Sequence, residues 1–419
     1  LQFSEDPLPV FHSLQKKYSS GLVTVPTVGA GTVNTEFEIL TGMRQHDFGV
    51  SEYPYKTVLK SKMSESICTD LKKLGYSTHA VHNNEATFYG RNTVFSNIGF
   101  DTFCSMEYMN GLTDSPNGWS NDDVLSREIM KTLDSTSGPD FTMAITVQSH
   151  GKYDGIALDD PTIKVTGAPE GKEQAYEYYV NEIHEVDRMI DTLIKELSNR
   201  KEETVLVLYG DHLPSLDIQK DDLSNANLYQ TQYVVWDNMN LKKKTKNLHA
   251  YQLYAEVLDR IQIHEGMITK YHQQTKHRSK LYLTGLTTLS YDLLYGDNYA
   301  YDGENPFKQT ELQMGTEPVK LTSVQKTKSG YRVVGSGFTP YCKVYYDGTL
   351  VESEWISSEC LQLQDEFELD EADKKDSGEP ETEVTEPRDV PNAFVVEVQS
   401  DDGVVLSSTQ AYPASQVKK

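Results

Sequence analysis

The sequence lacks long apolar runs and is poor in positive charge. None of its 419 residues falls in an apolar run of about 18, the length that a membrane-spanning helix needs. It has 39 Lys and Arg against 63 Asp and Glu, a formal net charge of −24. A surface of that charge repels nucleic acid and anionic membranes. We therefore expect no spanning helix and no nucleic-acid partner.

Cysteine is also scarce. Cys68, Cys104, Cys342 and Cys360 form no C-x-x-C pair, which argues against a zinc ribbon or a redox motif. Cys342 and Cys360 could form a disulfide, or all four could be free buried thiols. The first residues, "LQFSEDPLPVFHSL", contain neither a signal-peptide core nor an initiator Met. We expect a soluble piece of a longer protein whose anchor lies upstream.

Residues 1–317 alternate helical and strand patterns, which predicts a mostly parallel central sheet with helices on both faces. The sequence predicts helices over 10–18, 56–75, 121–135 and around 179–197. It predicts strands over 77–82, 141–150, 204–212 and 231–238. In an α/β sheet of this kind, ligands bind beyond the carboxyl ends of the strands.

Residues 318–419 change character and predict a small, Ig-like β-sandwich as an accessory domain. Short strands alternate with Gly-rich turns, and Asp402-Gly403 marks a hairpin. The stretch 365–389 has twelve acidic and three basic residues. We expect it to be a solvated, disordered loop, with a calcium site as the alternative.

Polar residues end several predicted strands: His82, then Ser149 and His150, then Asp211 and His212. Asp211 and His212 follow the apolar run "TVLVLYG". A carboxylate beside an imidazole suits manganese, zinc or magnesium. The alternative is an Asp that caps a turn beside a surface His.

A Gly-flanked loop precedes a predicted helix in "VPTVGAGTVNTEFEILTGM", residues 25–43. Thr32 follows Gly31 at the helix start, where the helix dipole favours negative charge. A Thr hydroxyl is a poor nucleophile until a metal ion activates it. The loop could therefore carry a metal-bound nucleophile. The alternative is an ordinary Thr cap, with Glu36 completing a polar first turn.

Taken together, four stretches resemble the lipoteichoic acid synthase family of the alkaline phosphatase and sulfatase superfamily. The resemblance covers roughly residues 1–300, and the four stretches occur in the family's order: residues 25–43, "HNNEATFYGRNTVFSNIGFDTF" (82–103), "AITVQSHGKY" (144–153) and "LYGDHLP" (208–214).

The resemblance implies a metal-dependent phosphotransferase or phosphodiesterase at the outer face of a bacterial membrane. It would move glycerol phosphate from a phosphatidylglycerol-like lipid to a glycan or glycerol phosphate acceptor through a phospho-Thr32 intermediate. One divalent ion is implied, with Mn²⁺ favoured over Mg²⁺ or Zn²⁺. The implied metal ligands are Thr32, Asp211 and His212; the catalytic residues are Thr32 and His150; the substrate-binding residues are His82, Asn84, Tyr89, Arg91 and His150.

Three features depart from the family pattern. Tyr89 stands in place of Trp and Asn84 in place of Asp, and both changes affect the substrate pocket. The family's further metal ligand, a Glu on a strand upstream of the nucleophile loop, has no counterpart here. Glu5 and Asp6 are the only early carboxylates, and no strand-like run precedes residue 10. We expect that strand and its Glu to lie upstream of Leu1.

Two other functions remain open. A sulfatase would need a Cys or Ser that matures to formylglycine in a C/S-x-P-x-R setting, and "TVNTE" has neither the Pro nor the Arg. The chain could also be a catalytically inactive surface protein that binds through its β-sandwich.

Overall fold

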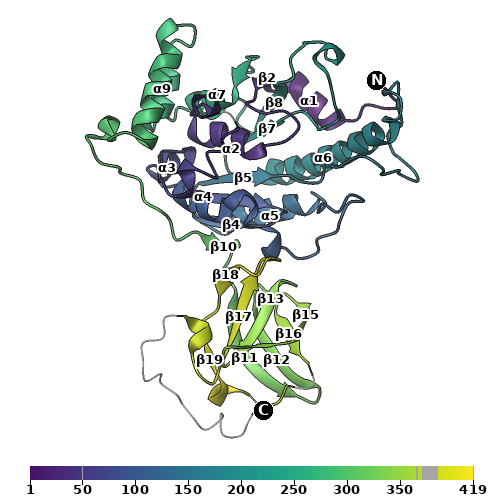
Figure 1. Ribbon diagram of the computed structural model, residues 1–419, viewed down its shortest axis with the longest axis vertical. Helices are drawn as coiled ribbons and strands as arrows, with labels where there is room; N and C mark the ends of the chain where they lie inside the picture. The colour runs from purple at the N-terminus through teal and green to yellow at the C-terminus, as the bar shows by residue number, and fades with distance from the viewer. Residues whose placement is uncertain (50, 365–366, 370–385, 419) are drawn as a thin grey trace.

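The computed structural model describes residues 1–419 except 50, 365–366, 370–385 and 419. An α/β part formed by the first three quarters of the chain stands above an all-β part formed by the last quarter (Figure 1). No helix among the described residues combines the length and hydropathy needed to cross a bilayer.

The first sheet of the α/β part is parallel throughout. Its strands, in spatial order, are β10 (Gln313–Met314), β4 (Thr102–Cys104), β3 (Ser77–His82) and β5 (Asp140–Ile145). The strand predicted over 77–82 is confirmed. The strand predicted over 141–150 is shorter than expected, because the backbone turns after Ile145 and delivers His150 in a loop.

The second sheet is mixed. Its order is β7 (Val205–Tyr209), β8 (Gln230–Asp237), β2 (Ser19–Thr24) and β9 (Leu248–His249). β8 runs antiparallel to both neighbours. The sequence analysis missed β2, which leads directly into the Thr32 loop. Gly21 weakens its strand pattern, yet a Cβ there would lie 2.0 Å from the Lys246 carbonyl oxygen, so the close backbone approach requires glycine.

A short third sheet pairs β1 (Gln2–Phe3) with β6 (Val165–Thr166), so the expectation of no strand before residue 10 is wrong, although β1 is exposed and lies in neither larger sheet. The two larger sheets face each other across a slot between β5 and β7. Within the described residues, neither strand has a partner on the facing edge. A cavity of about 1130 Å³ lies there, lined by both strands. All five β7 side chains are only half-buried. Tyr209 Oη lies 3.9 Å from Met143 Sδ across the slot.

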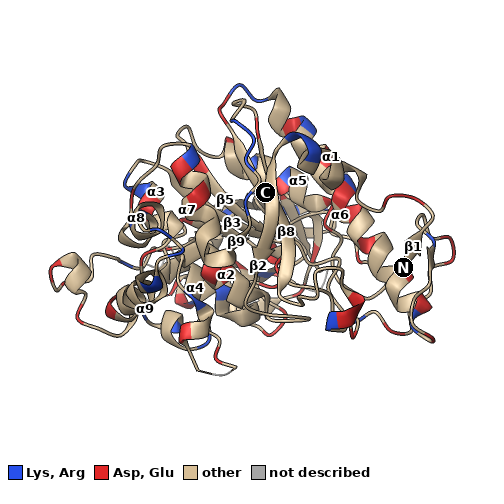
Figure 2. Cartoon of the chain, turned by 90° about the horizontal axis from the view of Figure 1, so that it is seen from above, with Lys and Arg blue, Asp and Glu red and all other residues tan. Residues whose placement is uncertain are grey.

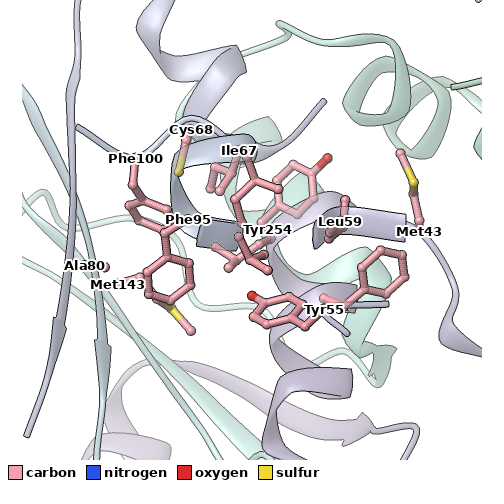
Figure 3. Close-up of a cluster of buried hydrophobic side chains, with 14 of the residues drawn as sticks. Met43, Tyr55, Leu59, Ile67, Cys68, Ala80, Phe95, Phe100, Met143 and Tyr254 are labelled. Atoms are coloured by element: carbon pink, nitrogen blue, oxygen red, sulfur yellow. The ribbon is translucent and has the colours of Figure 1, made fainter. Parts of the chain in front are cut away.

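Helices cover both faces of the sheets, as predicted. They are α1 (Pro9–Lys17), α2 (Thr32–Thr41), α3 (Ile67–Lys72), α4 (Arg91–Asn97), α5 (Val124–Asp134), α6 (Glu173–Asn199), α7 (Ala250–Arg260), α8 (Met267–Gln274) and α9 (Lys280–Leu294). α1, α5 and α6 share one apolar core. α2, α3, α4 and α7 share another, which includes Phe95, Met143 and Tyr254 (Figure 3).

The single helix predicted over 56–75 is wrong. Only a short 3-10 turn (Val58–Lys60) and α3 form there. The Ser66 hydroxyl accepts hydrogen bonds from the backbone N–H groups of Cys68 and Thr69, so α3 begins after Ser66. A local cap therefore overrides the apolar spacing that suggested one long helix.

The all-β part contains two antiparallel sheets. One has the order β11 (Lys320–Thr327), β12 (Gly330–Ser336), β16 (Cys360–Leu363) and β15 (Ser353–Ser357). The other has β14 (Thr349–Val351), β13 (Cys342–Tyr346), β17 (Ala393–Gln399) and β18 (Val405–Ser408), with β19 (Tyr412–Pro413) beside β17. The sheets share a core that includes Val333 and Phe394.

The predicted hairpin joins β17 to β18, and Gly403 adopts a φ of 81° at its turn. All four cysteines are free, which removes the proposed Cys342–Cys360 disulfide. Most of the acidic stretch 365–389, with its alternative calcium site, lies outside the described residues. The domain boundary at 317/318 stays a prediction.

Candidate active site

Thr32 is the first residue of α2. Gly31 caps the helix with a φ of 96°, and a Cβ there would lie 2.8 Å from Thr27 Oγ1, so this position favours glycine. The first N–H groups of a helix lack intrahelical acceptors and attract negative charge. The Thr32 hydroxyl is half-buried and lines the slot cavity. It is therefore placed where a developing negative charge is stabilised.

Asp211 and His212 follow β7 and face Thr32. Thr32 Oγ1 lies 3.4 Å from His212 Nε2, and His212 Nε2 lies 3.3 Å from Asp211 Oδ2. The Thr35 hydroxyl donates to the Asp211 carbonyl at 2.7 Å, and Gly29 N–H donates to the Leu213 carbonyl at 3.0 Å. These two hydrogen bonds fix the Thr32 loop against the end of β7.

The chemistry of these three donors fits a divalent cation. His212 Nδ1 lies 2.8 Å from the Leu213 carbonyl oxygen. Because that carbonyl can only accept, Nδ1 carries the proton and Nε2 keeps its lone pair toward Thr32 and Asp211. Of these three donors, only Asp211 is a carboxylate. Among the described residues, no group of three or more His, Cys, Asp or Glu side chains is placed to hold a metal ion. These three donors alone would fill only part of a divalent cation's coordination shell.

Glu5 and Asp6 do not complete that shell. Both are exposed, and neither lines the cavity. Asp6 instead accepts hydrogen bonds from the His12 ring and the Leu8 N–H. The hydrogen bond from His12 lowers the pKa of Asp6.

Arg91 is the first residue of α4 and is buried against α2. Its Nη2 and Nε donate to the two carboxylate oxygens of Glu36 at 2.6 and 3.2 Å. Its Nη1 is buried and has no hydrogen-bond acceptor among the described residues. A guanidinium held on one side and unsatisfied on the other is suited to an anionic acceptor.

His82 ends β3 and is fully buried. Its Nδ1 bonds the Ile145 carbonyl at 2.9 Å. Burial, followed by the charge of Arg91, lowers the pKa of His82 well below its ordinary value of 6.5. His82 is therefore a neutral imidazole near pH 7, and its Nε2 is the nitrogen available to a ligand.

His150 lies in the loop after β5 and is half-buried. Its Nδ1 lies 2.7 Å from the Gly151 carbonyl, and its ring meets Trp119 edge-on at 5.0 Å between centroids. The buried Asp122 accepts hydrogen bonds from Val147 and Gln148 N–H, which fixes the start of this loop. Burial raises the pKa of Asp122 to about 6.

Tyr89 precedes α4 and has a φ of 60°, an unusual conformation for a non-glycine residue. Its ring stacks on Tyr53 with 6.1 Å between centroids, and Lys56 Nζ lies 5.0 Å from its centroid. The Asn84 side chain makes no hydrogen bond to another site residue in the described chain. The backbone carbonyl of Asn84 accepts a hydrogen bond from Met106 N–H at 3.1 Å.

The structure thus brings the predicted residues together in two groups. Thr32, His150, Asp211 and His212 line one cavity. Arg91 lies beside it, because its ion-pair partner Glu36 lines the cavity, and Arg91 Cζ is 5.5 Å from the Tyr89 ring centroid. His82 is close enough to Arg91 for that charge to add to burial in lowering the pKa of His82. Asn84 is not placed in either group by these contacts. Local sequence patterns did not indicate the contacts of Glu36, Tyr53 and Trp119. Glu36 lies on α2 after its first turn, so the polar first turn expected from Glu36 does not form.

The family model and the curated relatives place the chain in agreement with one another. The sulfatase family model matches residues 1–305. The chain is 30% identical over 262 residues to the "Putative cyclic beta-1,2-glucan modification protein" of Rhizobium meliloti, covering 58% of this chain and 40% of that protein. It is 23% identical over 197 residues to lipoteichoic acid synthase 2 of Bacillus subtilis, covering 46% of this chain and 29% of that protein. The chain therefore spans less than half of these relatives.

Two solved structures share the fold. The Streptococcus pyogenes phosphoglycerol transferase GacH in complex with sn-glycerol-1-phosphate matches with a TM-score of 0.60 at 22% identity, over 74% of this chain and 85% of that one. The lipoteichoic acid synthase LtaP from Listeria monocytogenes matches with a TM-score of 0.51 at 19% identity, over 63% of this chain and 70% of that one.

Proposed function

Because the chain belongs to the sulfatase family, we propose that it is the catalytic part of a metal-dependent phosphotransferase that acts outside the cell. It moves glycerol phosphate from a phosphatidylglycerol-like lipid through a covalent phospho-Thr32. The observation that carries the proposal is the 3.4 Å approach of Thr32 Oγ1 to His212 Nε2 at the start of α2. The names of the synthase relatives and of GacH support glycerol phosphate as the transferred group.

Thr32, Asp211 and His212 are the residues that would hold the divalent cation, for which we propose Mn²⁺ ahead of Mg²⁺ or Zn²⁺. The ion supplies Lewis acidity, lowering the pKa of the Thr32 hydroxyl and offsetting negative charge. The protein's own part is to orient the three donors through the hydrogen bonds of Thr35, Gly29 and the Leu213 carbonyl.

In the first half-reaction, Thr32 Oγ loses its proton to water and attacks the phosphorus of the donor phosphodiester. The Thr32–O–P bond forms, and the P–O bond to diacylglycerol breaks. His150 donates a proton to the departing oxygen, so diacylglycerol leaves as a neutral alcohol.

In the second half-reaction, an acceptor hydroxyl attacks the same phosphorus and passes its proton to His150. The bond to Thr32 breaks, and Thr32 regains its proton. Water in place of the acceptor gives hydrolysis and free glycerol phosphate. The name of the R. meliloti relative supports a glycan hydroxyl as the acceptor.

Arg91 and His82 line the phosphate pocket in this proposal, and Arg91 binds the phosphoryl oxygens. The unsatisfied Nη1 of Arg91 supplies a charged donor, and Glu36 holds the rest of the guanidinium. His82 is neutral with its proton on Nδ1, which donates to the Ile145 carbonyl, so its Nε2 can accept a hydrogen bond from a hydroxyl of the transferred group. Tyr89 and Asn84 border the head group, and Tyr89 is fixed by Tyr53 and Lys56.

The slot between β5 and β7 supports the proposal that one ligand of the metal is supplied by a further strand. A strand inserted there would pair with both free edges, and its carboxyl end would emerge beside Asp211 and His150, which line the same cavity. We propose that a segment upstream of Leu1 supplies this strand together with a Glu that completes the metal shell. A further protein ligand is usual for a tightly held ion of this class.

Two alternative functions would require a different nucleophile or a different assay result. A sulfatase-type hydrolase would need a nucleophile that can mature to formylglycine, which Thr32 cannot do. An inactive surface-binding protein would show no turnover with any donor, although it could retain Thr32 and His212.

The proposal is tested by diacylglycerol release from phosphatidylglycerol, with Mn²⁺ present, in a version of the chain extended upstream of Leu1. Thr32→Ala should abolish release, whereas Thr32→Ser should keep measurable turnover because a hydroxyl remains. Unchanged release from the Thr32→Ala variant would overturn the proposed mechanism, and absence of release from the unmutated extended chain would favour the binding protein.

A further inference from the structure

α9 and the residues just after it expose several large apolar side chains. They are Leu281, Leu283 and Tyr291 of α9, Tyr295 at its C-terminal cap and Tyr299 in the following turn, with exposed fractions of 73%, 42%, 63%, 52% and 77%; we call these five the α9 apolar face. α9 stands at one corner of the α/β part and points away from it (Figure 1). Exposed apolar side chains gathered in one place mark a surface that binds a partner.

The helix pattern explains why these side chains face solvent. Tyr282, Leu286 and Leu293 are buried and form the inner stripe of α9. Leu281, Tyr291 and Tyr295 fall on the opposite side, with Thr284 and Thr288 between them at helical spacing. The ribbon of α9 is mostly tan, since Lys280 and Asp292 are its only charged residues (Figure 2). Asp292 is occupied by the N–H groups of Tyr299 and Ala300.

A basic turn precedes this face. Lys276, Arg278 and Lys280 are exposed, and their side chains form no ion pair or hydrogen bond within the part of the chain that the structure describes. Three free cations within five residues stand out in a chain of net charge −24. The overall charge repels an anionic surface, whereas this turn attracts one.

A second basic run lacks these properties. In residues 242–246, Lys244 and Lys246 pair with Glu256, and Lys243 donates to the carbonyls of Gln15 and Lys16. The exposed large apolar side chains of the described chain do not fall in that run. Free cations and exposed aromatic residues thus coincide at α9.

We propose that the basic turn 276–280 and the α9 apolar face together dock on an anionic phospholipid surface. Tyr and Leu side chains enter the interfacial region, where amphipathic rings are favoured, and the cations meet lipid phosphates. Charge complementarity selects an anionic bilayer over an uncharged one. The inference stands on this surface alone and does not require Thr32 chemistry.

α9 also contacts the nucleophile helix through one aromatic residue. Phe48 lies 6.3 Å from Tyr295 and 5.3 Å from Phe37 of α2, measured between ring centroids. Thr287 Oγ1 donates to Asp47 Oδ2 at 3.0 Å. A bilayer held at α9 would therefore lie on the side of the molecule that packs against the Thr32 helix, which suits a lipid donor.

The test is co-sedimentation of the chain with vesicles of phosphatidylcholine alone, or mixed with phosphatidylserine or phosphatidylglycerol. Phosphatidylserine presents the charge without the proposed substrate head group. We expect binding to both anionic mixtures, weaker binding at high salt, and at least tenfold weaker binding to phosphatidylcholine. Thr32→Ala should bind as the unmutated chain does, which separates docking from catalysis.

Two variants probe the two parts of the surface. The triple variant Lys276→Gln, Arg278→Gln, Lys280→Gln should lose roughly tenfold or more in vesicle affinity. Leu281→Ser with Tyr291→Ser should lose affinity at unchanged charge. The matched control, Lys201→Gln, Lys242→Gln, Lys328→Gln, removes the same charge from exposed positions elsewhere. Thermal melting verifies that each variant is folded.

The inference is overturned if the control triple weakens binding as much as the basic-turn triple. It is also overturned if anionic and uncharged vesicles bind equally. Concentration-dependent dimers that Leu281→Ser and Tyr291→Ser abolish, without vesicle binding by the unmutated chain, would assign the face to a second copy instead.

Discussion

Thr32 Oγ1 and His212 Nε2 lie 3.4 Å apart, although 180 positions separate the two residues in the chain. The Thr32 helix and the end of β7 bring them together, and the hydrogen bond from Thr35 to the Asp211 carbonyl fixes the approach. A hydroxyl, an imidazole nitrogen and a carboxylate meet at one point, at the positive end of a helix. The arrangement suits activation of an alcohol for attack on a phosphoester.

Replacing the Thr32 hydroxyl should affect chemistry and leave stability unchanged. Thr32→Ala removes one half-buried hydroxyl from the first residue of α2, where it makes no capping hydrogen bond, so the free energy of unfolding should change by no more than about 0.5 kcal/mol. Turnover should fall below detection. Urea unfolding and diacylglycerol release measure the two effects on the same preparation, and a variant that is active or largely unfolded would contradict the prediction.

Metal content should depend on the strand that we propose upstream of Leu1. Thr32, Asp211 and His212 provide a single carboxylate, so the chain starting at Leu1 should hold well under one divalent ion per molecule. Restoring the strand should raise the content toward one, and His212→Ala should lower it again. Elemental analysis after dialysis measures both lengths. A stoichiometric ion in the short chain would contradict the incomplete shell and redirect attention to Glu5 and Asp6.

Filling the slot should also stabilise the fold. Among the residues that the structure describes, β5 and β7 each have one edge without a strand partner, and the half-buried side chains of β7 would become covered. The extended chain should therefore melt at a higher temperature than the short chain, even in the presence of a chelator. Equal melting temperatures would show that the added segment lies elsewhere.

The head-group pocket should respond to Tyr89. Tyr is shorter than Trp and carries a hydroxyl, so this pocket should accept a more polar head group and discriminate less strictly for glycerol phosphate. Tyr89→Trp should raise the preference for phosphatidylglycerol over other phospholipids by roughly tenfold in kcat/KM. Tyr89→Phe is the control that removes the hydroxyl alone. Strict glycerol phosphate selectivity in the unmutated protein would count against this account.

A buried carboxyl should give stability an unusual pH dependence. Burial raises the pKa of Glu38 from 4.5 to about 8. The folded state therefore favours the protonated form, and this contribution to stability is full below pH 4.5 and lost as the pH rises through 8.

The Glu38→Gln variant isolates this effect, because an amide oxygen can still accept the hydrogen bond that Gln45 N–H gives to Glu38 Oε1. Between pH 4.5 and 8, the stability of the unmutated chain should fall relative to Glu38→Gln by on the order of 3–5 kcal/mol. Denaturant titrations across that range measure the difference, and parallel pH curves would show that the Glu38 carboxyl does not titrate in this way.

Local sequence patterns predicted the elements that depend on local forces. The run "STHAVH" predicted β3, a short strand whose residues after Ser77 are all buried. The apolar spacing around 179–197 predicted α6, because a helix buried on one face repeats its apolar residues at that spacing. The helix expected over 56–75 failed since the Ser66 cap is stronger than apolar spacing. β2 was missed because Gly21 lowers the strand propensity of its run. Glycine is required there by the close approach of the Lys246 backbone, which the sequence does not reveal.

The site residues show the same contrast between features that local sequence patterns indicate and features that depend on packing between distant segments. Thr32, Asp211 and His212 could be proposed because each follows a recognisable strand or loop, and topology brings such ends together. The Glu36–Arg91 pair and the contact of Trp119 with His150 depend on how separate segments pack, so no local pattern indicated them. The slot between β5 and β7 was likewise visible only in three dimensions.

The most direct test of the central claim is mass spectrometry of the extended chain after brief incubation with Mn²⁺ and phosphatidylglycerol. The account predicts a glycerol phosphate adduct on the peptide that contains Thr32, present in Thr32→Ser on the new hydroxyl and absent from Thr32→Ala. Diacylglycerol release by the extended chain without any adduct on that peptide, or with the adduct on another residue, would contradict it.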